Sequence, residues 1–303
     1  MYVISAAIMI VMNVAAFILF GVDKYKAKRN RWRIPEGTLL LFCLLLGGIG
    51  GWAGMLFFHH KTRKWKFRIL VPLFAVVDVL IIAFLGWTSV YYHAGETAQT
   101  AMQTDGIVSV ERVKTGWLFD GPSDEEVLIF YPGAKVEETA YAPLLHTLAA
   151  KEADVYLMKM PFHLAFFRMN AADSVVRKGN YERIYIGGHS LGGAMAAGYA
   201  AGHADVIDGE ILLAAYPTKK TAVDTLLVYG SEDGVLRMSR VEKAPGSVTG
   251  AYEEYVISGG NHAQFGDYGE QAGDGRARIT IQEQQEQTLD EIHKFLNKCR
   301  SAA

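Results

Sequence analysis

The chain has 303 residues, half of them hydrophobic and 20% charged, which is long enough for two domains. Residues 1–90 carry 11 Lys and Arg against three acidic residues, whereas the remainder carries 19 against 29. An acidic globular part argues against nucleic acid as a partner, because phosphates need a basic face. Two cysteines without zinc-type spacing, Cys43 and Cys299, predict neither a metal site nor an intrachain disulfide.

Three apolar runs before residue 90 predict membrane segments, over residues 2–22, 38–58 and 69–87. Their lengths are close to the ~20 residues that cross a hydrocarbon core as a helix. Basic residues follow the first run instead of preceding it, which indicates an uncleaved helix and not a signal peptide. We therefore predict a helical transmembrane domain over residues 1–92, with two or three membrane segments, in a multi-pass membrane protein.

The second run has two possible arrangements, because its centre is the glycine cluster at residues 47–51. The flanking loops 23–37 and 59–68 carry six and five Lys and Arg. If the run spans the membrane, these loops lie on opposite sides, and one violates the positive-inside rule. A re-entrant hairpin would place both loops in the cytoplasm and the C-terminal part of the chain outside, and we favour it. An ordinary helix with a glycine-rich packing surface is the alternative.

Asp78 lies inside the third apolar run. An ionisable residue at such a position is either functional or has a structural partner, for which Asn13 is a candidate. The sequence leaves both interpretations open.

Residues 10–70 resemble a family of small bacterial membrane proteins of unknown function. The resemblance is carried by the glycine cluster and by three short motifs. These are Asp23-Lys24 with Ala27, Arg33-Ile34-Pro35-Glu36, and His60-Lys61-Thr62. It implies residence in a bacterial cell membrane and no known activity.

Residues 93–106 are polar and rich in small side chains, and we predict a linker there. From residue 107 to 303, short apolar runs alternate with segments of helical spacing. The predicted strands cover residues 107–113, 117–119, 127–131, 155–158, 183–186, 210–214, 225–229 and 254–257, and the predicted helices 141–150, 163–177, 191–201 and 282–298. This alternation predicts an α/β domain with a mainly parallel sheet, whose site lies at the carboxyl ends of the strands.

The pattern Gly-x-Ser-x-Gly occurs at residues 188–192, between a predicted strand and a predicted helix. This is the context of a nucleophile elbow, in which small residues two before and two after the serine let strand and helix approach each other. A glycine-rich turn without function would have the same pattern. We interpret Ser190 as a nucleophile because the strand, the helix and the doubled glycines are all in place.

A serine nucleophile needs a base, and the base needs an orienting acid, in the chain order Ser, Asp or Glu, His. Asp233 follows a predicted strand and is the candidate acid, with Glu232 as the alternative. His262 follows the next strand and is the candidate base, because His293 falls within the terminal helix pattern. We therefore predict catalytic roles for Ser190, Asp233 and His262.

An oxyanion intermediate needs two N–H donors. We assign one to Leu191, directly after the nucleophile, and the other to Ala134, in the loop after an early strand. Lys135, Phe162 and His189 are further candidates for substrate contacts. Each has a simpler explanation, as a solvated lysine, a core aromatic residue and a packing histidine.

The stretch from about residue 126 to the C-terminus resembles compact bacterial α/β hydrolases, in outline the dienelactone-hydrolase-like branch. The resemblance is carried by residues 131–134, 160–162, 188–193, 230–233 and 259–266. It implies an α/β-hydrolase fold and cleavage of an ester, thioester or amide through an acyl-enzyme, most simply a small or lipid-like ester, without metal or organic cofactor. A catalytically silent binding or sensing module and a transporter-like membrane protein are the alternatives.

Overall fold

The computed structural model describes residues 2–302 and divides the chain into two compact units. The first unit ends at Val90 and the second begins at Tyr91. We call them the helical unit and the α/β unit and describe each by itself.

The helical unit contains three stretches that are long and apolar enough to cross a membrane. They are α1 (Tyr2–Lys28), the stretch Glu36–Phe57, and α4 (Trp65–Ser89). The middle stretch consists of α2 (Glu36–Phe42), a π-type turn (Cys43–Gly47) and α3 (Gly48–Phe57). It is broken because Leu45 and Leu46 leave the helical conformation, Leu46 with φ of 66°.

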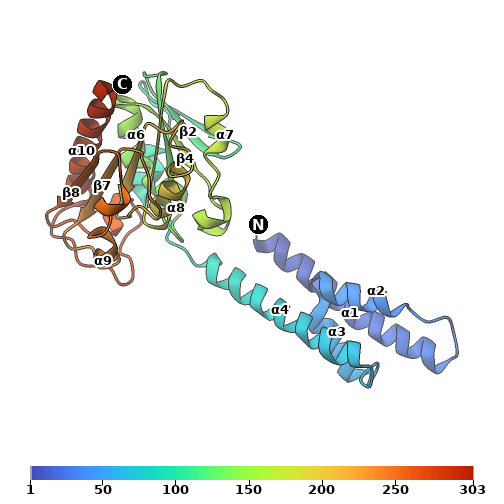
Figure 1. Ribbon diagram of the computed structural model, residues 1–303. Helices are drawn as coiled ribbons and strands as arrows, with labels where there is room; N and C mark the ends of the chain where they lie inside the picture. The colour runs from blue at the N-terminus through green and yellow to red at the C-terminus, as the bar shows by residue number, and fades with distance from the viewer. Residues whose placement is uncertain (1, 303) are drawn as a thin grey trace. The chain divides into compact units, whose positions relative to one another are not determined.

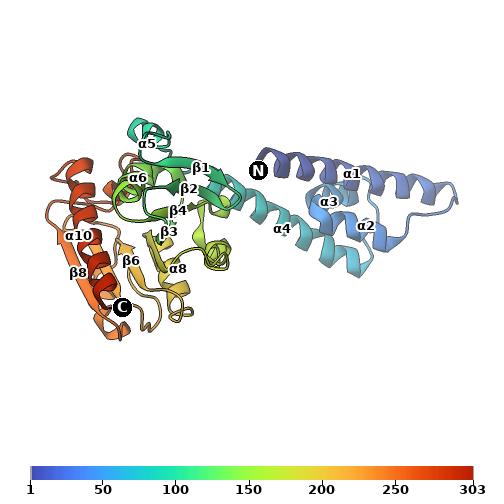
Figure 2. The same ribbon diagram turned by 90° about the horizontal axis from the view of Figure 1, so that it is seen from above.

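The break reverses the chain, so that α2 and α3 form a helical hairpin. Lys61, just after α3, donates a hydrogen bond of 2.8 Å to Glu36, the first residue of α2. The two ends of the hairpin therefore lie at the same level. Gly51 packs so closely on Cys43 that a Cβ atom there would lie 2.3 Å from its Sγ. In Figure 2, α3 lies between α1 and α4, and it packs against both.

The tip of the hairpin is closed by two polar side chains from the neighbouring helices. Asn13 Oδ1 accepts a 2.6 Å hydrogen bond from Gly50 N–H, and its Nδ2 donates to Leu46 O at 2.8 Å. Asp78 Oδ2 accepts from Ile49 N–H at 3.1 Å, and Asp78 is 1% exposed. Backbone groups freed by a bend need such partners in an apolar environment. Asp78 therefore has a structural partner, which is the backbone of the hairpin and not Asn13.

The open end of the hairpin gathers the motifs that resemble the small membrane-protein family. The fully buried Asp23 accepts hydrogen bonds from Ile34 N–H at 2.9 Å and, with its other oxygen, from His60 Nε2 at 2.7 Å. Lys61 Nζ lies 3.6 Å from the same carboxylate. The motifs thus meet around one buried charge, although they are up to 37 residues apart in the chain.

The α/β unit is built on one eight-stranded sheet with the order β1-β2-β4-β3-β5-β6-β7-β8. The strands are β1 (Ser109–Val113), β2 (Gly116–Asp120), β3 (Glu126–Tyr131), β4 (Asp154–Met158), β5 (Arg183–His189), β6 (Gly209–Leu213), β7 (Thr225–Gly230) and β8 (Tyr252–Ile257). The β1–β2 and β2–β4 pairs are antiparallel, and all others are parallel. All residues of β3, β4, β6 and β7 are buried, as in a sheet covered on both faces.

Helices cover both faces of the sheet (Figure 1). They are α5 (Glu96–Ala101), α6 (Ala142–Lys151), α7 (Asp173–Val176), α8 (Leu191–Ala200), α9 (Met238–Val241) and α10 (Ile281–Ala302). Leu128 and Phe130 of β3 share one hydrophobic cluster with α6 and α10. Ile129, between them, points to the opposite face and packs with α8. Because successive side chains of a strand point to opposite faces, β3 contributes to a hydrophobic core on each face of the sheet.

The segment expected to be a linker, residues 93–106, is instead part of the α/β unit. Tyr92 pairs with the loop after β3, where its N–H donates to Lys135 O at 2.7 Å. Helix α5 follows, and Ala98 within it is fully buried and donates its N–H to Asp267 Oδ2 at 2.9 Å. The small side chains that suggested a linker are what allow this close packing.

The prediction of one helix over residues 163–177 is also wrong. The chain forms 3-10 turns at Pro161–His163 and Ala165–Arg168 and then the short helix α7. Phe162 and His163 both have φ of 56°, which interrupts a helix. The buried Tyr131 side chain holds the irregular backbone, since its hydroxyl donates to Met169 O and accepts from Ala172 N–H, each at 2.8 Å.

We predict that Gly50→Ala destabilises the helical unit, because the new Cβ atom would lie 1.9 Å from Asn13 O. Overpacking of this kind costs about 1–3 kcal/mol. Gly86→Ala is the matched control, since its Cβ meets no atom within 4 Å and alanine favours the helix. Thermal stability of the purified full chain in detergent, followed by size exclusion after heating, should fall only for Gly50→Ala. Equal stability of the two variants would contradict the hairpin packing.

Candidate active site

Ser190 lies at the carboxyl edge of the sheet, in the turn between β5 and α8. Its φ of 54° and ψ of −123° are strained for a residue with a side chain, at a cost of about 1–3 kcal/mol. The turn is possible because a Cβ atom on Gly188 or Gly192 would lie only 2.5 or 2.2 Å from Tyr131 O. Ser190 N–H donates to Leu213 O at 2.9 Å. The predicted strand–turn–helix context of the elbow is present.

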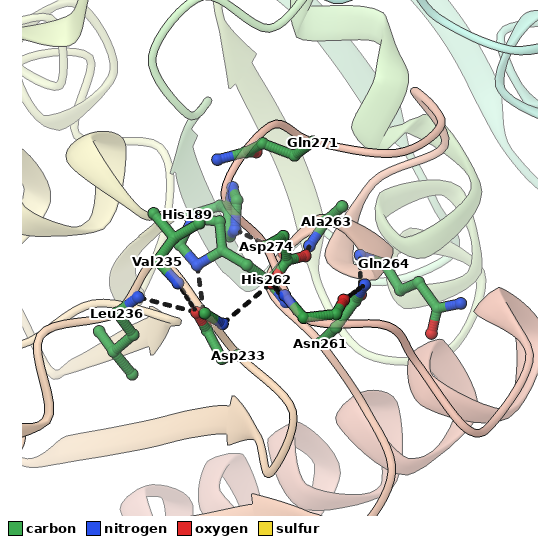
Figure 3. Close-up of polar contacts among 12 residues, drawn as sticks. His189, Asp233, Val235, Leu236, Asn261, His262, Ala263, Gln264, Gln271 and Asp274 are labelled. Carbon is green, nitrogen blue, oxygen red and sulfur yellow. Dashed lines mark hydrogen bonds and ion pairs between the residues drawn. The ribbon is translucent and has the colours of Figure 1, made fainter.

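Asp233 and His262, which follow β7 and β8, are brought together (Figure 3). Asp233 Oδ1 accepts hydrogen bonds of 2.8 Å from the N–H groups of Val235 and Leu236. Its Oδ2 lies 2.8 Å from His262 Nδ1, and both side chains are 1% exposed. Glu232, the alternative acid, instead pairs with Arg278.

This contact decides which nitrogen of His262 is chemically available. A carboxylate accepts the Nδ1 proton, so Nε2 of the neutral ring has a free lone pair. Nε2 is buried and has no hydrogen-bond partner within residues 2–302. Unpaired buried polar atoms are uncommon, and a catalytic role is one reason for which they persist. The arrangement suits a general base.

Asp274 is a component of the site that the sequence analysis missed. Its Oδ1 accepts from His262 N–H at 3.2 Å and from Gly234 N–H at 3.1 Å, and its Oδ2 from Ala263 N–H at 2.9 Å. One carboxylate therefore ties the loop of the acid to the loop of the base (Figure 3). Its only signal in the sequence is a carboxylate between two glycines, Gly273 and Gly275, which is typical of turns.

A second buried network links three loops. Gly133 N–H donates to the Tyr141 hydroxyl at 3.0 Å, and this hydroxyl lies 2.8 Å from His189 Nδ1. His189 Nε2 donates to His262 O at 3.0 Å. Because a carbonyl only accepts, Nε2 carries the proton and the tyrosine donates to Nδ1. Burial holds the pKa of His189 well below its ordinary range, so the ring is neutral beside His262.

The two predicted oxyanion donors, Leu191 and Ala134, stay predictions, and the structure describes the backbone around each of them. Leu191 is the first residue of α8, and the helix itself does not bond its N–H. On either side of Ala134, the N–H groups of Gly133 and Lys135 are already used, by Tyr141 OH and by His163 O at 2.8 Å.

The candidate substrate contacts differ in accessibility. His189 is 1% exposed and both ring nitrogens are bonded, so it supports the loops and does not face a substrate. Lys135 and Phe162 are half-buried in neighbouring loops at the carboxyl edge. Residues 2–302 contain no group of three or more His, Cys, Asp or Glu side chains that could hold a metal ion.

Comparison with known proteins assigns both units to families. The profile of the alpha/beta hydrolase family matches residues 127–286, and a profile described as a protein of unknown function (DUF1294) matches residues 13–67. The chain belongs to the alpha/beta hydrolase family, with a DUF1294 domain fused before the hydrolase domain. The uncharacterised protein YsdA of Bacillus subtilis is 40% identical over 80 residues, which are 26% of this chain and 90% of that protein.

Solved structures share the fold at low sequence identity. A bacterial membrane phospholipase A has a TM-score of 0.50 at 12% identity, covering 78% of this chain and 99% of its own. An esterase from Mycobacterium tuberculosis has a TM-score of 0.48 at 12% identity, covering 67% and 95%. At this identity the likeness shows the fold alone.

We predict that Tyr141→Phe lowers both stability and the reactivity of Ser190. It leaves Gly133 N–H and His189 Nδ1 unpaired in a buried site, at about 1–3 kcal/mol for each group. The rate of Ser190 labelling by a fluorophosphonate should fall about tenfold, and the melting temperature should fall with it. Tyr229→Phe, which removes a hydroxyl bonded to Glu254 at 2.9 Å, is the control and should label at the wild-type rate. Unchanged labelling of Tyr141→Phe would show that the network does not position the site.

Proposed function

We propose that the protein is a membrane-anchored serine hydrolase that cleaves an ester, thioester or amide, an ester being the first choice. The observation that carries this proposal is the unpaired, buried Nε2 of His262, whose Nδ1 is held by Asp233. The strained conformation of Ser190, next to His189 whose ring lies 4.5 Å from that of His262, supports it.

The first half of the reaction forms an acyl-enzyme. Ser190 Oγ attacks the carbonyl carbon while its proton moves to His262 Nε2. Asp233 stabilises the imidazolium that forms, and the N–H groups of Leu191 and Ala134 bind the negative oxygen, each donor contributing about 2.7–4 kcal/mol. Collapse of the intermediate breaks the bond to the leaving group, which departs with the proton from His262.

The second half releases the acid. His262 takes a proton from a water molecule, whose oxygen attacks the acyl carbon, and returns the proton to Ser190 Oγ as the ester bond breaks. No cofactor is required by these steps.

A catalytically silent binding module is the second candidate. The unpaired Nε2 of His262 disfavours it, because a buried nitrogen without a partner costs stability and a silent module gains nothing from it. The strained backbone of Ser190 also disfavours a silent module, because the strain costs stability and a silent module does not need it.

The hairpin supports an extracytoplasmic α/β unit. Its two ends, at Glu36 and Lys61, lie at the same level, so the two basic loops flanking it share one side of the membrane. By the positive-inside rule that side is the cytoplasm. Helix α4 then crosses to the opposite side, where the α/β unit follows.

We predict that wild type is labelled covalently by a fluorophosphonate probe, whereas Ser190→Ala is not labelled. His262→Ala should lower the labelling rate at least a hundredfold, because the serine loses its base. Mass spectrometry of the labelled peptide identifies the site. A folded wild-type protein that does not react would move the binding-module interpretation to first place.

We predict that Arg31→Cys and Arg63→Cys resist a membrane-impermeant maleimide in right-side-out spheroplasts, whereas Glu286→Cys reacts. All three positions are exposed, and the background carries serine at the buried Cys43 and Cys299. Lysed spheroplasts are the control, in which all three should react. Opposite behaviour of Arg31→Cys and Arg63→Cys would mean that the middle stretch spans the membrane.

A further inference from the structure

The α/β unit exposes one group of aromatic side chains, on residues 161–169, which we call the aromatic loop. Phe166 is 47% exposed, Phe167 45% and Met169 49%. Within residues 91–302, no other Phe, Tyr or Trp side chain is this exposed. The Phe166 and Phe167 rings lie 4.1 Å apart, and Phe162 lies 5.4 Å from Phe167. Contiguous exposed apolar patches mark interaction or ligand-binding sites, whereas single exposed apolar residues are ordinary.

The aromatic loop is fixed beside the proposed oxyanion donors. His163 O accepts the N–H of Lys135, the residue after Ala134, at 2.8 Å. At the other end, Met169 O accepts from the hydroxyl of Tyr131, the last residue of β3. The turn at Ala165–Arg168 packs on α8, the helix that begins after Ser190. In Figures 1 and 2 the loop is the yellow-green segment next to α8.

The backbone of the loop is held in a conformation that costs energy. Phe162 and His163 both have φ of 56°, a region that residues with side chains rarely occupy. Strain of this kind persists where the surroundings fix it, and it collects at ligand-binding sites. The hydrogen bonds at both ends of the loop supply that fixation.

The loop also contacts the first residue of the α/β unit. The Tyr91 ring stacks on His163, with centroids 3.9 Å apart and an angle of 24° between the planes. Tyr91 follows Ser89, the last residue of α4, by two positions in the chain. The aromatic loop thus packs on the residue at which the α/β unit begins, and Val90 alone separates that residue from α4 in the chain.

We propose that the aromatic loop binds the acyl chain of the substrate, so that the substrate class is long-chain esters of the kind held in a lipid bilayer. This inference rests on the proposed function. An acyl carbon bound to Ser190, with its oxygen at Ala134 and Leu191, leaves the acyl chain next to the loop that is bonded to Lys135. Transfer of CH₂ groups from water onto the phenylalanine rings then favours long chains over short ones.

The test compares two esters that share a leaving group, p-nitrophenyl dodecanoate and p-nitrophenyl acetate, with the full chain in mixed detergent micelles. The quantity measured is the ratio of kcat/KM for the two esters. In the double variant Phe166→Ser/Phe167→Ser, the ratio of kcat/KM for dodecanoate to that for acetate should fall at least tenfold. The double variant Phe166→Leu/Phe167→Leu should keep most of the wild-type ratio, because leucine is also apolar. Val206→Ser, an exposed apolar position at 39%, is the matched control and should leave the ratio unchanged.

The outcomes separate this inference from the function on which it rests. A wild type that reacts with fluorophosphonate but shows no preference for dodecanoate would overturn the inference alone. So would a serine double variant that keeps the wild-type ratio. A wild type that does not react with fluorophosphonate would overturn the proposed function and the inference with it.

Discussion

The site depends on three loops, from three different strands, being held within hydrogen-bond distance of one another at the carboxyl edge of one sheet. A parallel sheet brings the strand ends together but does not fix the loops that follow them. Here buried side chains do so. Asp274 bonds the backbone on both sides of the Asp233–His262 contact, and the Tyr141–His189 pair connects the loop after β3 to the backbone of His262. The Asp233 and His262 side chains thus have fixed positions although they lie on loops.

The helical unit meets a related constraint. A chain reversal inside an apolar helical bundle leaves backbone N–H and C=O groups without partners, and water is not available to replace them. Asn13 and Asp78 supply those partners from α1 and α4. The glycines of α3 then allow the closest approach, as the position of Gly50 against Asn13 shows. In both units a polar side chain, inserted from another element, stabilises an irregular piece of backbone.

The sequence predicted the parts of this protein that local rules control. The eight strands, the elbow at Ser190 and the approach of Asp233 to His262 follow from periodicity, from turn composition and from the order of elements. Asp274 and Tyr141 could not be found in the same way, because their roles come from contacts between segments distant in the chain. The prediction of a helix over residues 163–177 was wrong because Tyr131, far away in sequence, bonds the backbone of this segment in a conformation that is not helical throughout. The prediction of a linker over residues 93–106 was wrong because small polar residues are equally compatible with a mobile chain and with close packing.

The fusion of the helical unit to the α/β unit affects which partners the exposed side chains of the aromatic loop can contact. On a freely diffusing protein, three exposed apolar side chains in one loop favour self-association. If α4 crosses a bilayer, as proposed, the chain that follows it is confined to the bilayer surface, where apolar molecules are concentrated and the same side chains have a different partner. Membrane residence, as proposed, would also raise the effective concentration of a bilayer-embedded ester at the site without any added affinity. Under the proposed function, a short, fixed loop at the carboxyl edge would then select long acyl chains.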